Sequence, residues 1–146
     1  MKRPNIVITK TIKVSLVMTA KNGIISQPSP YSVTETIDRL VATLQSKSIT
    51  IFARIDQQVE ADKVGFSLRP MQLLLFGSPQ AGTPLMVAEP TIALDLPLKL
   101  AAWEAADGKV WLSYDDARYL QQRFSLSDAL VKHIDVIASL IHQVLL

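Results

Sequence analysis

The chain has 146 residues and a formal net charge of +2, and 49% of its residues are hydrophobic against 19% charged. This length and composition predict one globular domain over residues 1–146 and exclude a disordered polar chain. Since the chain contains no cysteine, disulfides, thiolate nucleophiles and cysteine-bound metal centres are excluded as well.

Two segments have some features of a signal peptide or a membrane span. The chain begins with basic side chains, but Lys10 and Lys13 interrupt the apolar stretch that a signal peptide requires. Residues 70–88 carry no formal charge, but their prolines and glycines break any helix that could span a membrane. The sequence therefore predicts a cytoplasmic protein without a membrane span.

Basic residues are concentrated near the start of the chain, because residues 1–34 hold five Lys or Arg and no Asp or Glu. Such a segment could attract an acidic partner, but it has no aromatic residue before Tyr31 on which a base could stack. We therefore expect solvated lysines and no binding to nucleic acid.

The first predicted element is a β-hairpin. Apolar and polar residues alternate over residues 11–18, which is typical of a half-buried strand. Asn22-Gly23 follows, the dipeptide best suited to the positive φ angles of a two-residue hairpin turn. The return strand is expected to begin near Ile24.

A helix, a strand and a short helical turn are predicted next. Ser32 stands three residues before Glu35, as in a helix capping box, and apolar residues recur at helical spacing over residues 33–47. Over residues 49–56 the apolar period changes to two, which indicates a strand. A short helical turn after that strand is expected to end at Gly65.

The middle of the chain combines a buried strand with an irregular connection. Residues 71–76 are mostly apolar without clean alternation, which is typical of a central strand covered on both faces. Thr83 and Pro84 have the residue types of a helix N-cap and first helical position. We expect a short helix there, interrupted at Pro90.

A second hairpin is indicated by Asp107-Gly108, which lies between two apolar-rich segments. A two-residue turn at this dipeptide would place Lys99, Trp103 and Tyr114 on one face of the hairpin.

Two helices are predicted at the end of the chain. Asp115 or Asp116 can cap a short helix that runs through Phe124, and an amphipathic helix is expected over about residues 127–145. Its apolar arc exceeds half of the circumference, so that a second helix or a second subunit must cover the remainder. The central stripe of this arc consists of Leu130, Ile134, Ile137, Ile141 and Val144. The order of elements predicts an α+β fold with a mainly antiparallel sheet and helices on one face.

Few sequence patterns indicate a binding or catalytic function. Residues 77–84 have the glycine spacing of a phosphate-binding loop, but Thr83 and Pro84 stand where that loop needs its lysine and hydroxyl residue. Nucleotide hydrolysis is thereby excluded, and what remains is either a helix start at Thr83 that holds an anion or a plain turn and cap. His133 and His142 fall on opposite sides of one predicted helix, and His133 is expected in the core or an interface. No metal and no cofactor are expected.

Two carboxylates and one lysine are further candidates for a functional site. Asp56 ends a predicted strand, and Asp95 and Lys99 flank the start of another. The last two side chains either form a polar spot in an apolar cleft or a surface ion pair.

Five ordered motifs resemble the bacterial family known as domain of unknown function 302. They are SPYSVTET at 29–36, IFARID at 51–56, KVGFSLRP at 63–70, LLLFGSPQAGTPLM at 73–86 and DLPLKLAAWEAADGKVWLSYDD at 95–116. The resemblance covers about residues 24–124. It implies a TATA-binding-protein-like topology, a homodimer and no established activity. The family usually has a histidine after the FARID segment, where this chain has Gln57, so that no metal, haem or acid–base role is expected there.

The leading hypothesis is a non-catalytic homodimer that binds a small anionic or amphipathic ligand. The ligand is expected beside the segment 77–99 and the second hairpin. One alternative is an enzyme with Asp56 or Asp95 as general base and Tyr114 or Lys99 polarising the substrate. Another is a purely structural interaction domain. The candidate ligand-binding residues are Asp56, Thr83, Asp95, Lys99 and Tyr114.

Overall fold

The computed structural model describes residues 18–19 and 22–145, so that most of the strand predicted over residues 11–18 lies outside the described residues. The strands are β1 (Met18–Thr19), β2 (Ile24–Ser29), β3 (Thr50–Asp56), β4 (Met71–Gly77), β5 (Leu98–Glu104) and β6 (Val110–Asp115). The helices are α1 (Val33–Ser46), α2 (Gln57–Lys63), α3 (Pro79–Ala88), the 3-10 helix η1 (Pro90–Leu94), α4 (Ala117–Arg123), α5 (Asp128–Val131) and α6 (Ile137–Leu145).

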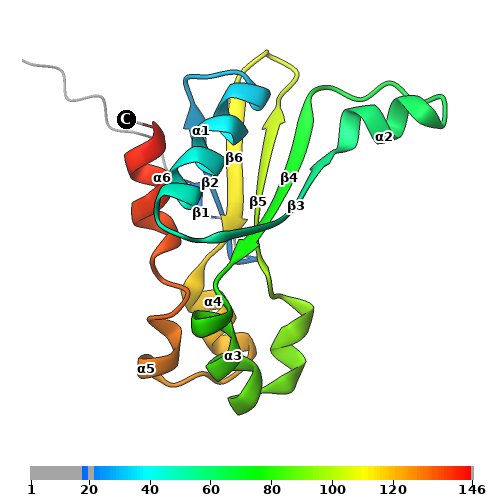
Figure 1. Cartoon of the computed structure of the whole chain (residues 1–146). Coiled ribbons are helices and arrows are strands. Elements are labelled where there is room, and N and C mark those ends of the chain that lie inside the picture. Colours follow the sequence, from blue (N-terminus) through cyan, green and yellow to red (C-terminus); the bar gives the residue numbers. More distant parts are fainter. Residues whose placement is uncertain (1–17, 20–21, 146) are drawn as a thin grey trace, which may run out of the picture.

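All strands form one antiparallel sheet with the order β1-β2-β6-β5-β4-β3. Helices α1 and α6 lie on one face of this sheet, while α3, η1, α4 and α5 gather at one end and α2 projects from the other (Figure 1). The predicted α+β class with a mainly antiparallel sheet is therefore confirmed.

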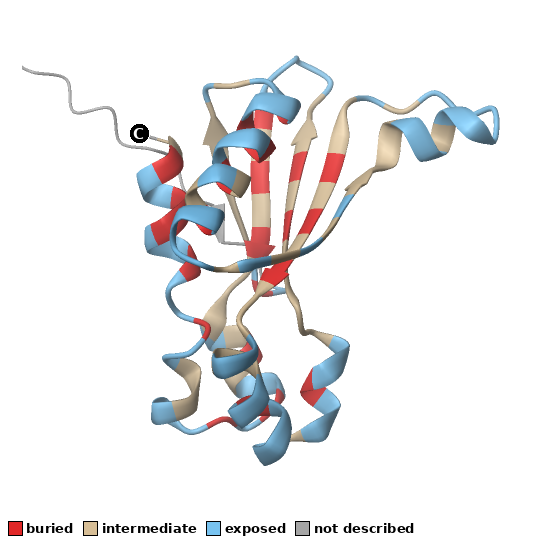
Figure 2. Ribbon diagram, viewed as in Figure 1, coloured by how far each residue is buried: buried red, intermediate tan, exposed pale blue. Residues whose placement is uncertain are grey.

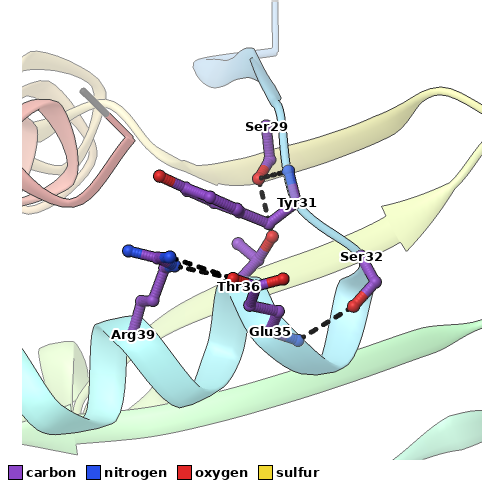
Figure 3. Close-up of polar contacts among 6 residues, drawn as sticks. All are labelled: Ser29, Tyr31, Ser32, Glu35, Thr36 and Arg39. Carbon is purple, nitrogen blue, oxygen red and sulfur yellow. Dashed lines mark hydrogen bonds and ion pairs between the residues drawn. The ribbon is translucent and has the colours of Figure 1, made fainter.

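The start of α1 follows the predicted cap. Ser32 Oγ accepts a hydrogen bond from the backbone N–H of Glu35 at 3.1 Å. Glu35 in turn accepts two hydrogen bonds from Arg39, whose guanidinium lies 3.8 Å from the ring centre of Tyr31 (Figure 3). These contacts fix the direction in which the chain leaves β2 and enters α1.

The turns of both hairpins differ from the predicted two-residue turns. Gly23 has the positive φ, +77°, expected of a turn residue, but Thr19 pairs with Ile25, whereas a two-residue turn at Asn22-Gly23 would pair Thr19 with Ser26. In the second hairpin, Glu104 pairs with Val110 and the N–H of Gly108 bonds to the carbonyl of Ala105, so that the turn is longer than the predicted two residues. The prediction of a shared face for Lys99 and Tyr114 is therefore wrong, since a shift of one residue turns a side chain to the other face.

Helix α3 begins five residues earlier than predicted. Pro79 occupies the first position and Ser78 the N-cap, without a capping hydrogen bond from its side chain. Thr83 and Pro84 lie inside the helix. The dipeptides Ser78-Pro79 and Thr83-Pro84 both have the residue types of a helix start, and the earlier one is used. The predicted helix start at Thr83, which both the anion site and the plain cap required, is therefore wrong.

The single C-terminal helix predicted over residues 127–145 is also divided. Its first turn is α5, residues 132–136 form turns, and the chain resumes as α6. The break turns the two halves toward different hydrophobic clusters: Ile134 packs beside α3, η1 and α4, and Ile141 packs beside α1 and the sheet. The wide apolar arc is thus covered largely within one chain.

These two clusters form the core, and both are seen as buried segments in Figure 2. The main cluster lies between α1, α6 and one face of the sheet, with Ile37, Leu74 and Ile141 almost inaccessible to solvent. The end cluster lies among α3, η1, α4 and the turns after α5. The prediction is that both faces of β4 are covered; in the described residues β4 is a central strand whose residues alternate between buried and half-buried, so that one face is fully covered and the other only in part.

Candidate functional site

An apolar cleft of about 280 Å³ separates the main cluster from the end cluster. One wall is α3, a second is formed by β3 and the end of β4, and the floor includes residues 96–98 and the segment 133–140. Phe76 and Leu140 belong to the main cluster, whereas Leu85 and Ile134 belong to the end cluster. The cleft therefore exists because two separately packed parts of one chain meet along it.

The chemistry of the cleft is almost wholly apolar. Its polar side chains are those of Ser78, Thr83 and His133, and Ser78 Oγ already donates a hydrogen bond to Gln80 at 3.2 Å. Among the described lining residues there is no carboxylate, Lys or Arg. Such a surface favours a ligand with a hydrocarbon body and few polar atoms.

Gly82 helps to keep the cleft open. A Cβ placed on Gly82 would lie 3.9 Å from Leu96 Cδ1 and 4.0 Å from Met86 Cε, which is ordinary contact distance. The glycine thus leaves space that a larger side chain on α3 would occupy. Phe52, which is 52% exposed on β3, completes the opposite wall.

A group of charged residues lies outside the cleft, where β5 begins and β6 ends. Asp95 is largely buried, and its Oδ2 lies 3.6 Å from Arg123 Nη1. Within the described part of the chain, this oxygen has no hydrogen-bond partner. Burial raises the pKa of Asp115, and nearby Asp95 raises it further, while Lys99 and Arg123 act in the opposite direction. We call these four side chains the charged cluster.

The raised pKa of Asp115 predicts a pH-dependent effect of Asp115→Asn. The unfolded chain releases this proton near the ordinary value of 3.8, before the folded chain does. The contribution of Asp115 to stability is therefore full below that pH and is lost as the pH rises through the folded-state pKa. Urea unfolding at several pH values should show Asp115→Asn gaining stability relative to the wild type as the pH rises. A difference independent of pH would contradict this account.

The structure does not bring the five predicted site residues together. Thr83 lines the cleft, and Asp95 and Lys99 lie in the charged cluster. Tyr114 is buried on the helix-covered face, where burial and the nearby Asp116 raise its pKa. Asp56 lies at the far end of β3 and caps α2, accepting a hydrogen bond from the N–H of Val59 at 3.1 Å.

The predicted ligand segment, residues 77–99, contributes α3 and residues 96–98 to the cleft, but sequence reasoning missed the parts of the lining that come from β3 and from the segment 133–140. His133 was expected in the core or an interface, but it is exposed and lines the cleft. The uncharged segment 70–88 was the available signal, because its second half supplies the α3 wall. In the part of the chain that the structure describes, no group of three or more His, Asp or Glu side chains is placed to hold a metal ion.

Comparison with known proteins identifies the family. The chain belongs to the family described as domain of unknown function DUF302, whose model matches residues 25–144. A crystal structure of an uncharacterised conserved DUF302 protein from Bacillus stearothermophilus has the same fold. It has a TM-score of 0.70 and 18% identity, and the match covers 84% of this chain and 95% of that one.

The curated relatives are longer proteins. The chain is 43% identical over 114 residues to the "Fluoride-specific ion channel FluC 1" of Brucella suis and to that of Brucella abortus. These matches cover 76% of this chain but only 45% and 42% of the Brucella proteins. The chain therefore spans less than half the length of these relatives. No helix within residues 18–19 and 22–145 is long and apolar enough to cross a membrane.

Proposed function

We propose that this protein is a non-catalytic homodimer whose protomers each bind a small amphipathic molecule in the cleft. The observation that carries the proposal is the lining of the cleft, which combines large apolar side chains with two hydroxyls and one imidazole. A hydrocarbon chain would pack between Phe76, Leu85 and Leu140, and its polar end would bond to Thr83 or His133.

The composition of the cleft favours an amphipathic ligand over a strongly anionic one. Lys99, the cation first proposed to bind an anion, projects from the sheet face opposite to the one that packs on α1. Arg123 is engaged with Asp95. Binding strength would then come mainly from the apolar area removed from water, at about 25 cal/mol per Å².

The size of the cleft restricts the ligand class. Its volume of about 280 Å³ is just below the usual range for small-molecule sites, so that a medium-chain acid or alcohol fits better than a long lipid. The name of the Brucella relatives would suggest fluoride, but the lining residues offer no Lys or Arg to hold a small hard anion.

The enzyme hypothesis has weaker support. Asp56 is engaged in capping α2, far from the charged cluster that contains Asp95 and Lys99. A general base and a polarising group must both reach one substrate. Of the candidate pairs, only Asp95 and Lys99 lie in one place, the charged cluster, where Asp95 already forms an ion pair with Arg123. The cleft itself contains no carboxylate among its described residues.

The test is a substitution that fills the cleft. Octanoate and 1-octanol are titrated by calorimetry into the wild-type protein and into Ala81→Phe, because Ala81 lines the cleft on α3. We expect the phenyl ring to weaken binding at least tenfold, which corresponds to about 1.4 kcal/mol.

Ala88→Phe is the matched control, since Ala88 is exposed on the same helix outside the cleft. It should bind as the wild type does. Equal binding by both variants, or no binding of either compound to the wild type, would contradict the proposed site. Binding of octanoate alone would show that the carboxylate matters more than this proposal allows.

A further inference from the structure

The sheet has a second face that no helix of the described chain covers (Figure 1). Strand pairing places one set of alternate residues from β3, β4, β5 and β6 on this open face. An antiparallel strand with one solvated face is normally polar on that face, but here large apolar side chains prevail. They are Ile55, Met71, Leu73, Leu75, Trp103 and Trp111, all half-buried.

The polar groups at the centre of the open face already have partners within the sheet. Trp103 Nε1 donates a hydrogen bond to Ser113 Oγ at 2.9 Å, and Ser113 Oγ is bonded to Ser26 Oγ at 2.7 Å. The rings of Trp103 and Trp111 are stacked with their centres 6.3 Å apart. Contact with another apolar surface would therefore remove water from this area without breaking a hydrogen bond.

The charges on the open face have opposite signs on two neighbouring strands. Leu100 pairs with Tyr114 on the covered face, so that Lys99 and Asp115, one residue further along each strand, both lie on the open face. The same register places Trp103 on β5 opposite Trp111 on β6. The cation and the Trp side chain on β5 thus lie beside an anion and a second Trp side chain on β6.

This arrangement is complementary to itself. A two-fold axis that runs parallel to the strands, between β5 and β6, would place β5 of one protomer over β6 of the other. Lys99 would then face the partner's Asp115, and Trp103 would face the partner's Trp111. Two such face-to-face sheets would form a sandwich with an apolar centre and an ion pair on each side of the axis.

From this complementarity we infer that the open face is the surface through which two copies of the chain associate. The inference rests on the proposed homodimer and adds the contacting surface and its symmetry. We assign the open face to a second copy of the chain because Lys99 and Asp115 lie on opposite sides of the axis. Each of the two charges would therefore face the opposite charge of the partner.

The test uses two charge reversals that are mixed. Lys99→Glu alone would set Glu against the partner's Asp115, and Asp115→Lys alone would set Lys against the partner's Lys99. Each variant alone should therefore have the monomer mass of 16.1 kDa by light scattering, at a concentration where the wild type has twice that mass. An equimolar mixture should recover the dimer mass, because each chain then meets the opposite charge across the axis.

The mixing step separates this inference from simpler explanations. Mixing leaves the charges within each chain unchanged, so that recovery of the dimer requires contact between chains at these residues. If both variants remain dimeric, the homodimer stands but its contact lies elsewhere. If the wild type is monomeric, both the homodimer and this surface are wrong, while the calorimetric test of the cleft keeps its meaning.

A second pair of variants covers the case in which Asp115→Lys does not fold. Leu73→Lys places a charge at the centre of the open face, and Val87→Lys places it on α3, where Val87 is 78% exposed. With circular dichroism showing folded protein, Leu73→Lys should be monomeric and Val87→Lys dimeric. A dimeric Leu73→Lys would overturn the inference.

Discussion

Gly23→Ala is expected to lower the free energy of unfolding by about 3 kcal/mol. Gly23 has a φ of +77°, and a Cβ at this position would collide with Cγ of Tyr119. The substitution therefore combines left-handed backbone strain with a collision against an aromatic ring. The N–H of Asp116 also bonds to the carbonyl of Gly23, so that a shift of the turn would disturb the start of α4. Urea unfolding followed by circular dichroism measures the loss.

Gly108→Ala is the control that isolates the collision. Gly108 has nearly the same φ, +81°, but no atom lies within 4 Å of an added Cβ. Gly108→Ala should therefore lower the free energy of unfolding by about 1 kcal/mol, through backbone strain alone. Similar losses for the two variants would mean that Tyr119 does not pack closely on the first hairpin turn.

Ile141→Ala is expected to cost about 3 kcal/mol of unfolding free energy. Ile141 is 0% exposed in the main cluster, where α6 packs against α1. Removing its outer carbons leaves a cavity between two helices and the sheet, which only partly closes. Thermal and urea unfolding of the purified variant would measure this loss.

Val136→Ala is the control for Ile141→Ala on the same segment. Val136 is 50% exposed just before α6, so that its truncation should change stability by about 0.5 kcal/mol or less. If Ile141→Ala had an effect as small as this, the C-terminal helix would not be part of the cooperative core.

The elements that the sequence predicted well are those defined by local interactions. The bounds of α1 follow from Ser32 and from apolar residues at helical spacing, and those of α4 follow from the cap on Asp116. In both cases the determining residues lie within a few positions of each other. Local hydrogen bonds and one apolar face are then sufficient to predict the element.

The errors arose where tertiary packing selects among several local solutions. Asp107-Gly108 suits more than one turn length, and the choice of the longer turn changed which face Lys99 shares. Residues 132–136 contain neither Pro nor Gly, so that no local signal marked the break between α5 and α6. The break is explained by the different positions of the two clusters that receive Ile134 and Ile141.

The complete cleft could not be predicted from the sequence for the same reason, because tertiary packing forms it. Its walls come from β3, α3, the segment before β5 and the segment before α6, which are far apart in the chain. The sequence indicates only the segment 77–99, which supplies α3 and residues 96–98. Phe52 had been assigned to an ordinary strand position, and nothing in its neighbours indicated that it would face α3.

The strand order also constrains how the chain reaches its native state. Strands β3 to β6 pair in the order in which they follow one another along the chain, and the longest connection between them, residues 78–97, holds α3 and η1. In contrast, β2 pairs with β6, the last strand, so that Ile25 meets Tyr114. Closing so large a loop costs more entropy than forming any of the sequential hairpins. During synthesis, β2 must therefore wait until the last strand of the sheet, β6, has left the ribosome, and until then the edge of β2 that pairs with β6 lacks its partner strand.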